Sequence, residues 1–205
     1  LAIKTNGTLW AWGRNTEGQL GLGNLTNYSS PVQVGALTNW SKIAGSYKFA
    51  VAVKTDGTLW SWGQGSRGEL GLGNLTSYSS PKQVGALTGW STLTSGSYFS
   101  LAIKTNGTLW SWGYGTDGRL GQGNITSYSS PKQIGALTTW ATTGSAGKSG
   151  AAISTNGSLW MWGRNNFGQL GLGNLTDYSS PKQVGALTTW TKVGMGYNFT
   201  LAIKT

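Results

Sequence analysis

The feature that most constrains this chain is an internal repeat of 50 residues that runs through all 205 of them. The opening segment, LAIKTNGTLW, recurs unchanged or nearly so at residues 51, 101 and 151, and residues 201–205 begin a fifth copy. Because the spacing shows no insertion or deletion, a second domain has no place in the chain. We expect one array over residues 1–205, composed of repeats 1–50, 51–100, 101–150 and 151–200. A single repeat cannot bury its apolar residues alone, so neighbouring repeats must stack.

Four short strands are predicted in each repeat. In the first copy they cover residues 1–5, 8–12, 31–34 and 40–44. The pair Asn6-Gly7 is the strongest short hairpin signal, because both central residues of a type I′ turn need positive φ. A long loop over residues 14–30 precedes the third strand, which Pro31 is expected to open. Four short strands in such a repeat are typical of a propeller blade, so the sequence predicts an all-β β-propeller of four-stranded antiparallel blades.

Tryptophan is unusually abundant, with 12 residues. Trp10 and Trp12 are two residues apart in a predicted strand and therefore share one face of it. Such rings could stack on bases or sugars. Their place in a strand between blades favours core packing instead, where each buried Trp removes roughly 150–250 Å² from water. We therefore expect Trp-lined blade interfaces, with the pair repeated at Trp60 and Trp62, Trp110 and Trp112, and Trp160 and Trp162.

The repeat also resembles a known family. The residues that carry the resemblance are Leu101–Gly113 (LAIKTNGTLWSWG), Gly118–Gly123 (GRLGQG), Pro131 and Trp140. This frame, which holds in every copy, is similar to the regulator of chromosome condensation repeat. The resemblance implies a propeller that closes as a seven-bladed ring.

The first and last residues bear on the number of blades. Residues 1–5 and 201–205 are the same predicted strand, so four repeats hold five copies of it. We therefore expect the chain to be a window of a longer array, part of a seven-bladed ring. A closed four-bladed ring with residues 201–205 displaced is the alternative.

The resemblance is weaker at the level of function. The family usually has a His just before the first strand, whereas this chain has no His and carries Phe49, Phe99, Ser149 and Phe199 there. The exchange factor that names the family also carries a protruding β insertion for its small GTPase. Four gap-free copies leave no room for that insertion. The short, Trp-rich repeats are more similar to bacterial and bacteriophage members, which are often surface or virion proteins.

Residues suited to catalysis or metal binding are scarce. The chain has no Cys and no His, which excludes disulfides, thiolate metal sites and His-activated nucleophiles. Acid–base catalysis needs a positioned carboxylate pair, but the five carboxylates are scattered over different repeats: Glu17, Asp56, Glu69, Asp117 and Asp177. The segment Gly18–Gly23 lacks the Lys and the helix of a phosphate-binding loop, so a structural turn is favoured. We expect no catalytic site, no cofactor and no metal ion.

The charge of the chain allows two interpretations. The formal net charge is +10, although only 10% of the residues are charged. A basic balance can indicate nucleic acid, an anionic membrane or an acidic glycan. Alternatively, Lys residues were copied with the repeat, since Lys82, Lys132 and Lys182 occupy one repeat position. They form a stripe and not a dense patch, so nucleic acid is not the favoured partner. No segment is long and apolar enough to span a membrane.

The residues that follow each Trp-Gly pair carry the most information about binding, because they differ between nearly identical copies. Loops of one kind emerge on one face of a propeller, where recognition usually occurs. Unconstrained drift of exposed turns is the alternative. Residues 42–50 and their copies vary as well. The candidate partner-binding residues are Arg14, Asn15, Glu17, Gln64, Arg67, Tyr114, Asp117, Arg164, Asn166 and Phe167.

Two functions of different classes follow. The first is a non-enzymatic structural or adhesive propeller of a prokaryotic surface or a bacteriophage virion, located in the particle or outside the cell. Its partners would be other protein subunits or a surface glycan. The alternative is a regulatory propeller of the chromatin or small-GTPase nucleotide-exchange type. The missing His positions and insertion count against the alternative, and the positive net charge favours it.

Overall fold

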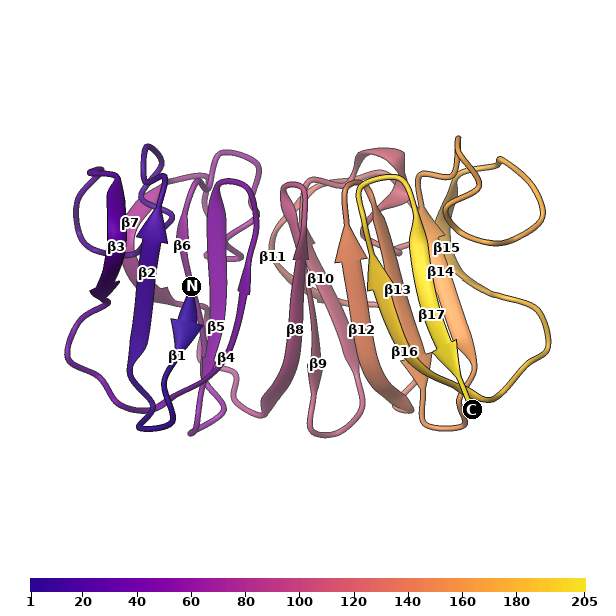
Figure 1. Ribbon diagram of the computed structural model, residues 1–205. Coiled ribbons are helices and arrows are strands. Elements are labelled where there is room, and N and C mark those ends of the chain that lie inside the picture. The colour runs from indigo at the N-terminus through magenta and orange to yellow at the C-terminus, as the bar shows by residue number, and fades with distance from the viewer.

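The computed structural model describes residues 1–205 as a fan of antiparallel sheets (Figure 1). No helix in it is long and apolar enough to cross a membrane. Apart from the short 3-10 helix η1 (Thr116–Gly118), the elements are the strands β1 (Ala2–Ile3), β2 (Leu9–Gly13), β3 (Tyr28–Gln33), β4 (Trp40–Gly45), β5 (Phe49–Lys54), β6 (Leu59–Gly63), β7 (Tyr78–Gln83), β8 (Trp90–Gly96), β9 (Phe99–Lys104), β10 (Leu109–Gly113), β11 (Tyr128–Gln133), β12 (Trp140–Ala146), β13 (Ser149–Ser154), β14 (Leu159–Gly163), β15 (Tyr178–Gln183), β16 (Trp190–Met195) and β17 (Thr200–Lys204).

Three complete four-stranded sheets stand between two smaller ones. The complete sheets have the orders β4-β5-β6-β7, β8-β9-β10-β11 and β12-β13-β14-β15, and the smaller ones are β1-β2-β3 and β16-β17. All pairings are antiparallel. The expected propeller of four-stranded antiparallel blades is confirmed. The sheets form an open arc with the two chain ends at opposite sides (Figure 1), and the seven-bladed ring stays a prediction.

Each complete sheet is offset from the sequence repeat. The fourth strand of one repeat, β4, pairs with β5 of the next repeat and so starts a new sheet. Its first residue, Trp40, lies opposite Lys54. The strands β4, β8, β12 and β16 also contact one another in series along the arc. Each complete sheet therefore joins two sequence repeats covalently and by hydrogen bonds.

The Asn-Gly hairpins form, but with a different turn from the expected one. The Gly7 N–H donates to the Lys4 carbonyl, and the Lys4 N–H donates to the Thr8 carbonyl. Only Gly7 of the pair has positive φ, at 78°. This is a three-residue loop in which a type I turn is followed by a left-handed glycine, so the type I′ prediction was wrong. Asn6 instead accepts hydrogen bonds from the Thr8 N–H and hydroxyl.

The third strand begins earlier than expected. It starts at Tyr28, and Pro31 lies inside it, so the prediction that Pro31 opens the strand was wrong. β3 pairs only with β2 and is the outer edge of its sheet. An edge strand has no partner on its outer side, so the missing N–H of a proline there leaves the sheet ladder intact.

The second Trp of the pair lies in a blade interface at Trp62, Trp112 and Trp162, whereas Trp12 is exposed. Trp112 is fully buried and belongs to a cluster with Phe49 and Leu70 of the preceding sheet. Its indole N–H donates a 3.0 Å hydrogen bond to the Glu69 carbonyl in the preceding loop. The first Trp of the pair, Trp110, is only half-buried. Equivalent bonds run from Trp62 to Gln19 and from Trp162 to Arg119.

Backbone hydrogen bonds from the glycine-rich loops also join neighbouring sheets. The Gly73 N–H donates a 2.7 Å hydrogen bond to the Ser129 carbonyl of the next sheet. Gly23 makes the same bond to Ser79. These glycines act as turns that let two backbones approach closely.

Candidate partner-binding site

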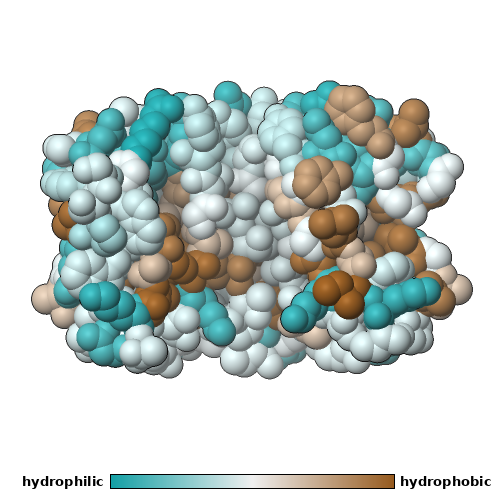
Figure 2. Space-filling view, viewed as in Figure 1, coloured by the Kyte–Doolittle hydropathy of each residue, from teal (hydrophilic) through white to brown (hydrophobic).

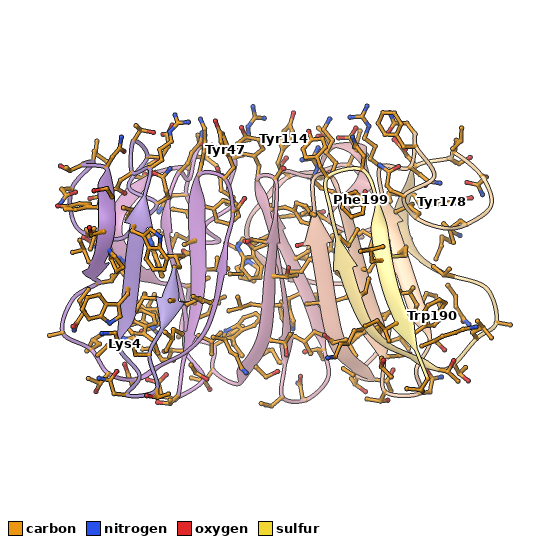
Figure 3. All side chains as sticks on the ribbon, viewed as in Figure 1. Lys4, Tyr47, Tyr114, Tyr178, Trp190 and Phe199 are labelled. Carbon is orange, nitrogen blue, oxygen red and sulfur yellow. The ribbon has the colours of Figure 1, made fainter.

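A pocket of about 580 Å³ opens on the face where the variable loops emerge. It is lined by the turns of the β4–β5, β8–β9, β12–β13 and β16–β17 hairpins, together with Arg67 and residues 114–119 of two variable loops. We call it the loop-face pocket. Tyr47 and Tyr114 lie at this edge of the fan, and Lys4 and Trp190 lie toward the opposite edge (Figure 3).

One wall of the loop-face pocket is a cation close to two aromatic rings. The Cζ atom of Arg67 lies 4.9 Å from the ring centroid of Tyr98 and 4.3 Å from that of Tyr114. Tyr98 comes from the β8–β9 hairpin, whereas Arg67 and Tyr114 come from successive variable loops. Such contacts are worth roughly 0.5–2 kcal/mol and fix the plane of the guanidinium.

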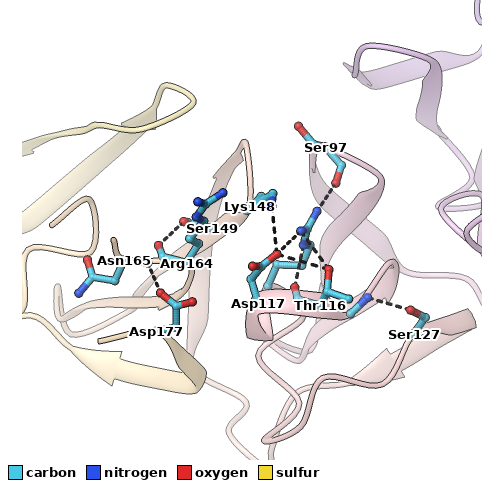
Figure 4. A network of polar contacts seen from close by, with 11 residues as sticks. Ser97, Thr116, Asp117, Ser127, Lys148, Ser149, Arg164, Asn165 and Asp177 are labelled. Carbon is cyan, nitrogen blue, oxygen red and sulfur yellow. Dashed lines mark hydrogen bonds and ion pairs between the residues drawn. The ribbon is translucent and has the colours of Figure 1, made fainter. Parts of the chain in front are cut away.

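The floor of the pocket is a buried arginine. The Arg119 side chain is about 1% exposed, and its guanidinium donates to the Thr116 carbonyl, the Thr116 hydroxyl, the Ser97 carbonyl and Asp117 (Figure 4). Ser97 lies in the β8–β9 hairpin, and Arg119 lies in the β10–β11 loop of the same sheet, so this one side chain ties the hairpin to the loop. Burial lowers the pKa of Arg119, and the contact with Asp117 opposes that shift.

Asp117 bridges two cations in the pocket. Its Oδ2 lies 2.5 Å from Arg119 Nη2 and 3.5 Å from Lys148 Nζ. Burial opposes ionisation of this carboxyl, but the Arg119 and Lys148 contacts outweigh it and hold its pKa below the usual value. Asp117 is therefore a charged structural partner of the pocket, unlike a protonated carboxyl that could act as an acid at neutral pH.

The rim of the pocket carries two further residues expected from the sequence. Glu17 pairs with Lys48 at 3.1 Å. Arg14 donates a 3.0 Å hydrogen bond to the Tyr47 hydroxyl. Together with Arg67, Tyr114 and Asp117, half of the candidate binding residues thus gather around one pocket.

The other candidate residues lie elsewhere. Asn15 is fully buried, and its side chain holds the loop by bonds to the Asn24 carbonyl and the Leu20 N–H. The Gln64 side chain bonds only to Ser66 within its loop, and its backbone N–H donates to the Lys48 carbonyl. Arg164, Asn166 and Phe167 belong to the last variable loop and do not line the pocket. That any of the ten residues binds a partner stays a prediction.

Sequence reasoning did not single out Lys48, Tyr98, Arg119 or Lys148, which supply much of the pocket. A signal for them was present, because their repeat positions vary. One position holds Lys48, Tyr98, Lys148 and Asn198. Another holds Gln19, Glu69, Arg119 and Gln169.

Glu69 is the only carboxylate that is fully buried. Its Oε2 accepts a 2.7 Å hydrogen bond from the Arg67 N–H, and its Oε1 has no hydrogen-bond partner. Burial raises the pKa of Glu69, and its hydrogen bonds together with nearby Arg67 and Lys48 offset only part of that rise. In the first repeat an amide fits the same place, where the Gln19 Oε1 accepts from the Glu17 N–H.

Glu69→Gln is therefore expected to raise the free energy of unfolding at neutral pH by about 1 kcal/mol, because it removes a buried charge. Since the pKa is higher in the folded state, the wild-type protein loses stability as pH rises from the unfolded pKa through the folded one. The difference in the free energy of unfolding between the variant and the wild-type protein should therefore disappear in acid. Denaturation curves measured across pH test this, with half-exposed Glu17→Gln as the control. A difference in the free energy of unfolding that does not change with pH would contradict this prediction.

A second cavity, of about 400 Å³, lies beside β14 and β17. Apolar side chains gather on this part of the surface (Figure 2), and the exposed Phe167 and Phe199 line the cavity. In the complete blades the equivalent space is filled by a Trp of the next sheet, such as Trp162. The second cavity therefore has the geometry of a blade interface. No group of three or more His, Cys, Asp or Glu residues is arranged to hold a metal ion.

The fold is shared with solved propellers. Human WBSCR16 superposes with a TM-score of 0.88 at 24% identity, over 99% of this chain and 55% of that one. Yeast Prp20 bound to Kap60 gives 0.85 at 21%, over 99% and 51%. Prp20p from Saccharomyces cerevisiae, studied with its binding to Gsp1p and histones, gives 0.83 at 22%, over 99% and 53%. The chain thus spans about half the length of these proteins. No curated protein sequence is significantly similar to it.

The repeats themselves match a described family. The sequence profile of the Regulator of chromosome condensation (RCC1) repeat matches residues 6–53, 56–103, 106–152 and 156–203. A second profile of the same repeat matches residues 40–69 and 90–119. These matches cover most of the chain and confirm the resemblance carried by its glycine, proline and tryptophan frame. The chain therefore belongs to the regulator of chromosome condensation (RCC1) repeat family.

Proposed function

We propose that this chain is a non-catalytic regulatory module of the RCC1 type, which binds a partner protein on the face that carries the loop-face pocket. The observation that supports this most is the concentration of sequence differences there. The repeats are nearly identical in β2, β3 and their copies, whereas the pocket is built from the variable loops and from the variable turns that follow β4, β8, β12 and β16. A face that serves only the fold has no need of such differences.

The comparisons favour this regulatory function over a virion or surface role. Prp20 is described with the proteins Kap60, Gsp1p and histones, and none of the solved propellers described above is named as a virion component. The virion, tail-fibre and adhesive hypothesis thus has no support from them. The proposed partner is a protein, and the proposal includes no membrane or glycan.

Nucleotide exchange is a second candidate, carried by the similarity to Prp20 alone. At 21–22% identity this similarity concerns the fold. The proposal therefore stops at protein binding, and an increased rate of nucleotide release from Gsp1p would extend it.

Binding to purified Kap60, Gsp1p and histones tests the proposal. We expect at least one of them to bind, and we expect Arg67→Ala combined with Tyr114→Ala to weaken that binding about tenfold or more, since clustered Arg and Tyr side chains often dominate an interface. Lys182→Ala, which removes a charge from the edge strand β15, is the control. The proposal is wrong if none of the three binds, or if the control weakens binding as much as the pocket variant.

A further inference from the structure

The loop-face pocket has a strong excess of positive charge. Its lining holds the basic residues Lys48, Arg67, Arg119 and Lys148, and its only acidic residue is Asp117. Glu17 on the rim pairs with Lys48, so the excess falls on Arg67, Arg119 and Lys148. A concave basic site concentrates anions near it.

Arg67 is the group in the pocket that is best prepared for an anion. No carboxylate lies within ion-pair distance of its guanidinium, because the three ion pairs of the chain use Lys48, Arg119 and Lys148. The Cζ atom of Arg67 lies within cation–π distance of the rings of both Tyr98 and Tyr114. A stacked guanidinium still presents the N–H groups along its edge, and this planar fork matches the two oxygens of a carboxylate or a phosphate.

Arg119 adds a fixed charge beneath this fork. A guanidinium has five N–H donors, and the protein provides four acceptor contacts to Arg119. One N–H of Arg119 Nη1 is therefore left without an acceptor in the protein. Lys148 Nζ lies 3.5 Å from Asp117 Oδ2, which is a long ion pair. The Lys148 ammonium can therefore turn toward an entering anion.

Two residues that line the pocket have a backbone conformation that is rare outside glycine. Tyr98, with φ of 64°, and Asp117, with φ of 60°, are the only residues other than glycine that have positive φ. Both line this pocket. Non-glycine residues in this conformation carry an energetic cost and cluster at ligand sites. Tyr98 lies in the two-residue turn between β8 and β9, which itself favours positive φ, and Asp117 lies in η1.

We infer that the loop-face pocket binds an acidic peptide segment, with one oxyanion group of the segment on the edge of Arg67 and near Lys148. This rests on the proposed function, whose partner protein would supply the segment. The oxyanion is a carboxylate or a phosphate, because both fit the fork. The four tyrosines around the opening, Tyr47, Tyr98, Tyr114 and Tyr197, provide apolar surface for neighbouring side chains. A nucleic acid would need a longer basic track than this single pocket.

Fluorescence anisotropy with short labelled peptides tests the inference on the full chain. The probes are a Glu-rich peptide, its Gln-substituted counterpart, and a neutral peptide with one phosphotyrosine. We expect the Glu-rich or the phosphorylated peptide to bind, the Gln counterpart not to bind, and binding to weaken as salt is raised. Which anionic peptide binds more tightly identifies the oxyanion. A single-stranded oligonucleotide of similar charge is expected to bind less tightly than the peptide.

Two variants and one matched control locate the site. Arg67→Gln removes the fork and should weaken binding about tenfold or more. Tyr98→Gly removes one ring but suits the positive φ, so it should keep the fold and still weaken binding. Arg164→Gln removes a guanidinium from a variable loop outside the pocket and should change little.

The results separate the two proposals. Equal binding of the Gln counterpart, an equal loss in Arg164→Gln, no binding of either anionic peptide, or tighter binding of the oligonucleotide would overturn the inference. If an anionic peptide binds through Arg67 but Kap60, Gsp1p and histones do not bind, the inference holds and the proposed function fails. If one of those proteins binds and neither peptide does, only the inference fails.

Discussion

Replacing Trp112 by Ala is expected to lower the free energy of unfolding by about 3–5 kcal/mol. Trp112 has no exposed surface and packs between two sheets, against Phe49, Leu70 and Trp90. Truncation also removes the indole donor of the Glu69 carbonyl, across the blade interface. In a repeat protein the interface between neighbours supplies much of the stability. Chemical denaturation followed by circular dichroism measures the loss.

The chain contains its own control for this prediction. Trp12 occupies the same repeat position in β2 but is 43% exposed, because no sheet precedes it here. We expect Trp12→Ala to cost less than about 1 kcal/mol, as for most exposed positions. Similar losses for the two variants would show that the blade interface contributes little at this position.

Replacing Gly118 by Ala is expected to cost about 2–5 kcal/mol. Gly118 has φ of 70°, and an added Cβ would lie 2.6 Å from Ser179 Cα in the backbone of the next sheet. A left-handed conformation costs an alanine about 1–2 kcal/mol, and overpacking costs a further 1–3 kcal/mol or so. Because backbone cannot rotate away as a long side chain can, the two sheets must separate.

Gly168 provides the matched comparison. It has the same repeat position and a similar φ of 75°, but the nearest atom to an added Cβ is Leu175 Cδ2 at 3.7 Å. Gly168→Ala should therefore show the cost of the left-handed backbone alone, about 1–2 kcal/mol. The difference between the two variants measures the contact between sheets. Equal losses in denaturation experiments would mean that the sheets can part without cost.

The sequence by itself determined the repeat length, the number of strands in each repeat and the family. These properties depend on local signals that every copy contains, namely the Asn-Gly hairpin, the Trp pair and the Gly-rich loop. Local signals act within a few residues, so they can be recognised without knowledge of the packing. The type of hairpin turn was missed, because an Asn-Gly pair suits more than one loop length and the strand register selects between them.

The tertiary structure decided which strands share a sheet and where a binding pocket forms. The strand from Trp40 hydrogen-bonds to the next repeat, because pairing with β5 completes a sheet that the first repeat alone cannot close. Arg67, Tyr98 and Lys148 come from separate segments, and only the fan of sheets brings their side chains around one pocket. Nothing local in the sequence encodes that meeting, since it depends on the angle and spacing of stacked blades. The sequence could show that these positions vary between copies. Only the packing of the four hairpins brings the variable residues together around one pocket.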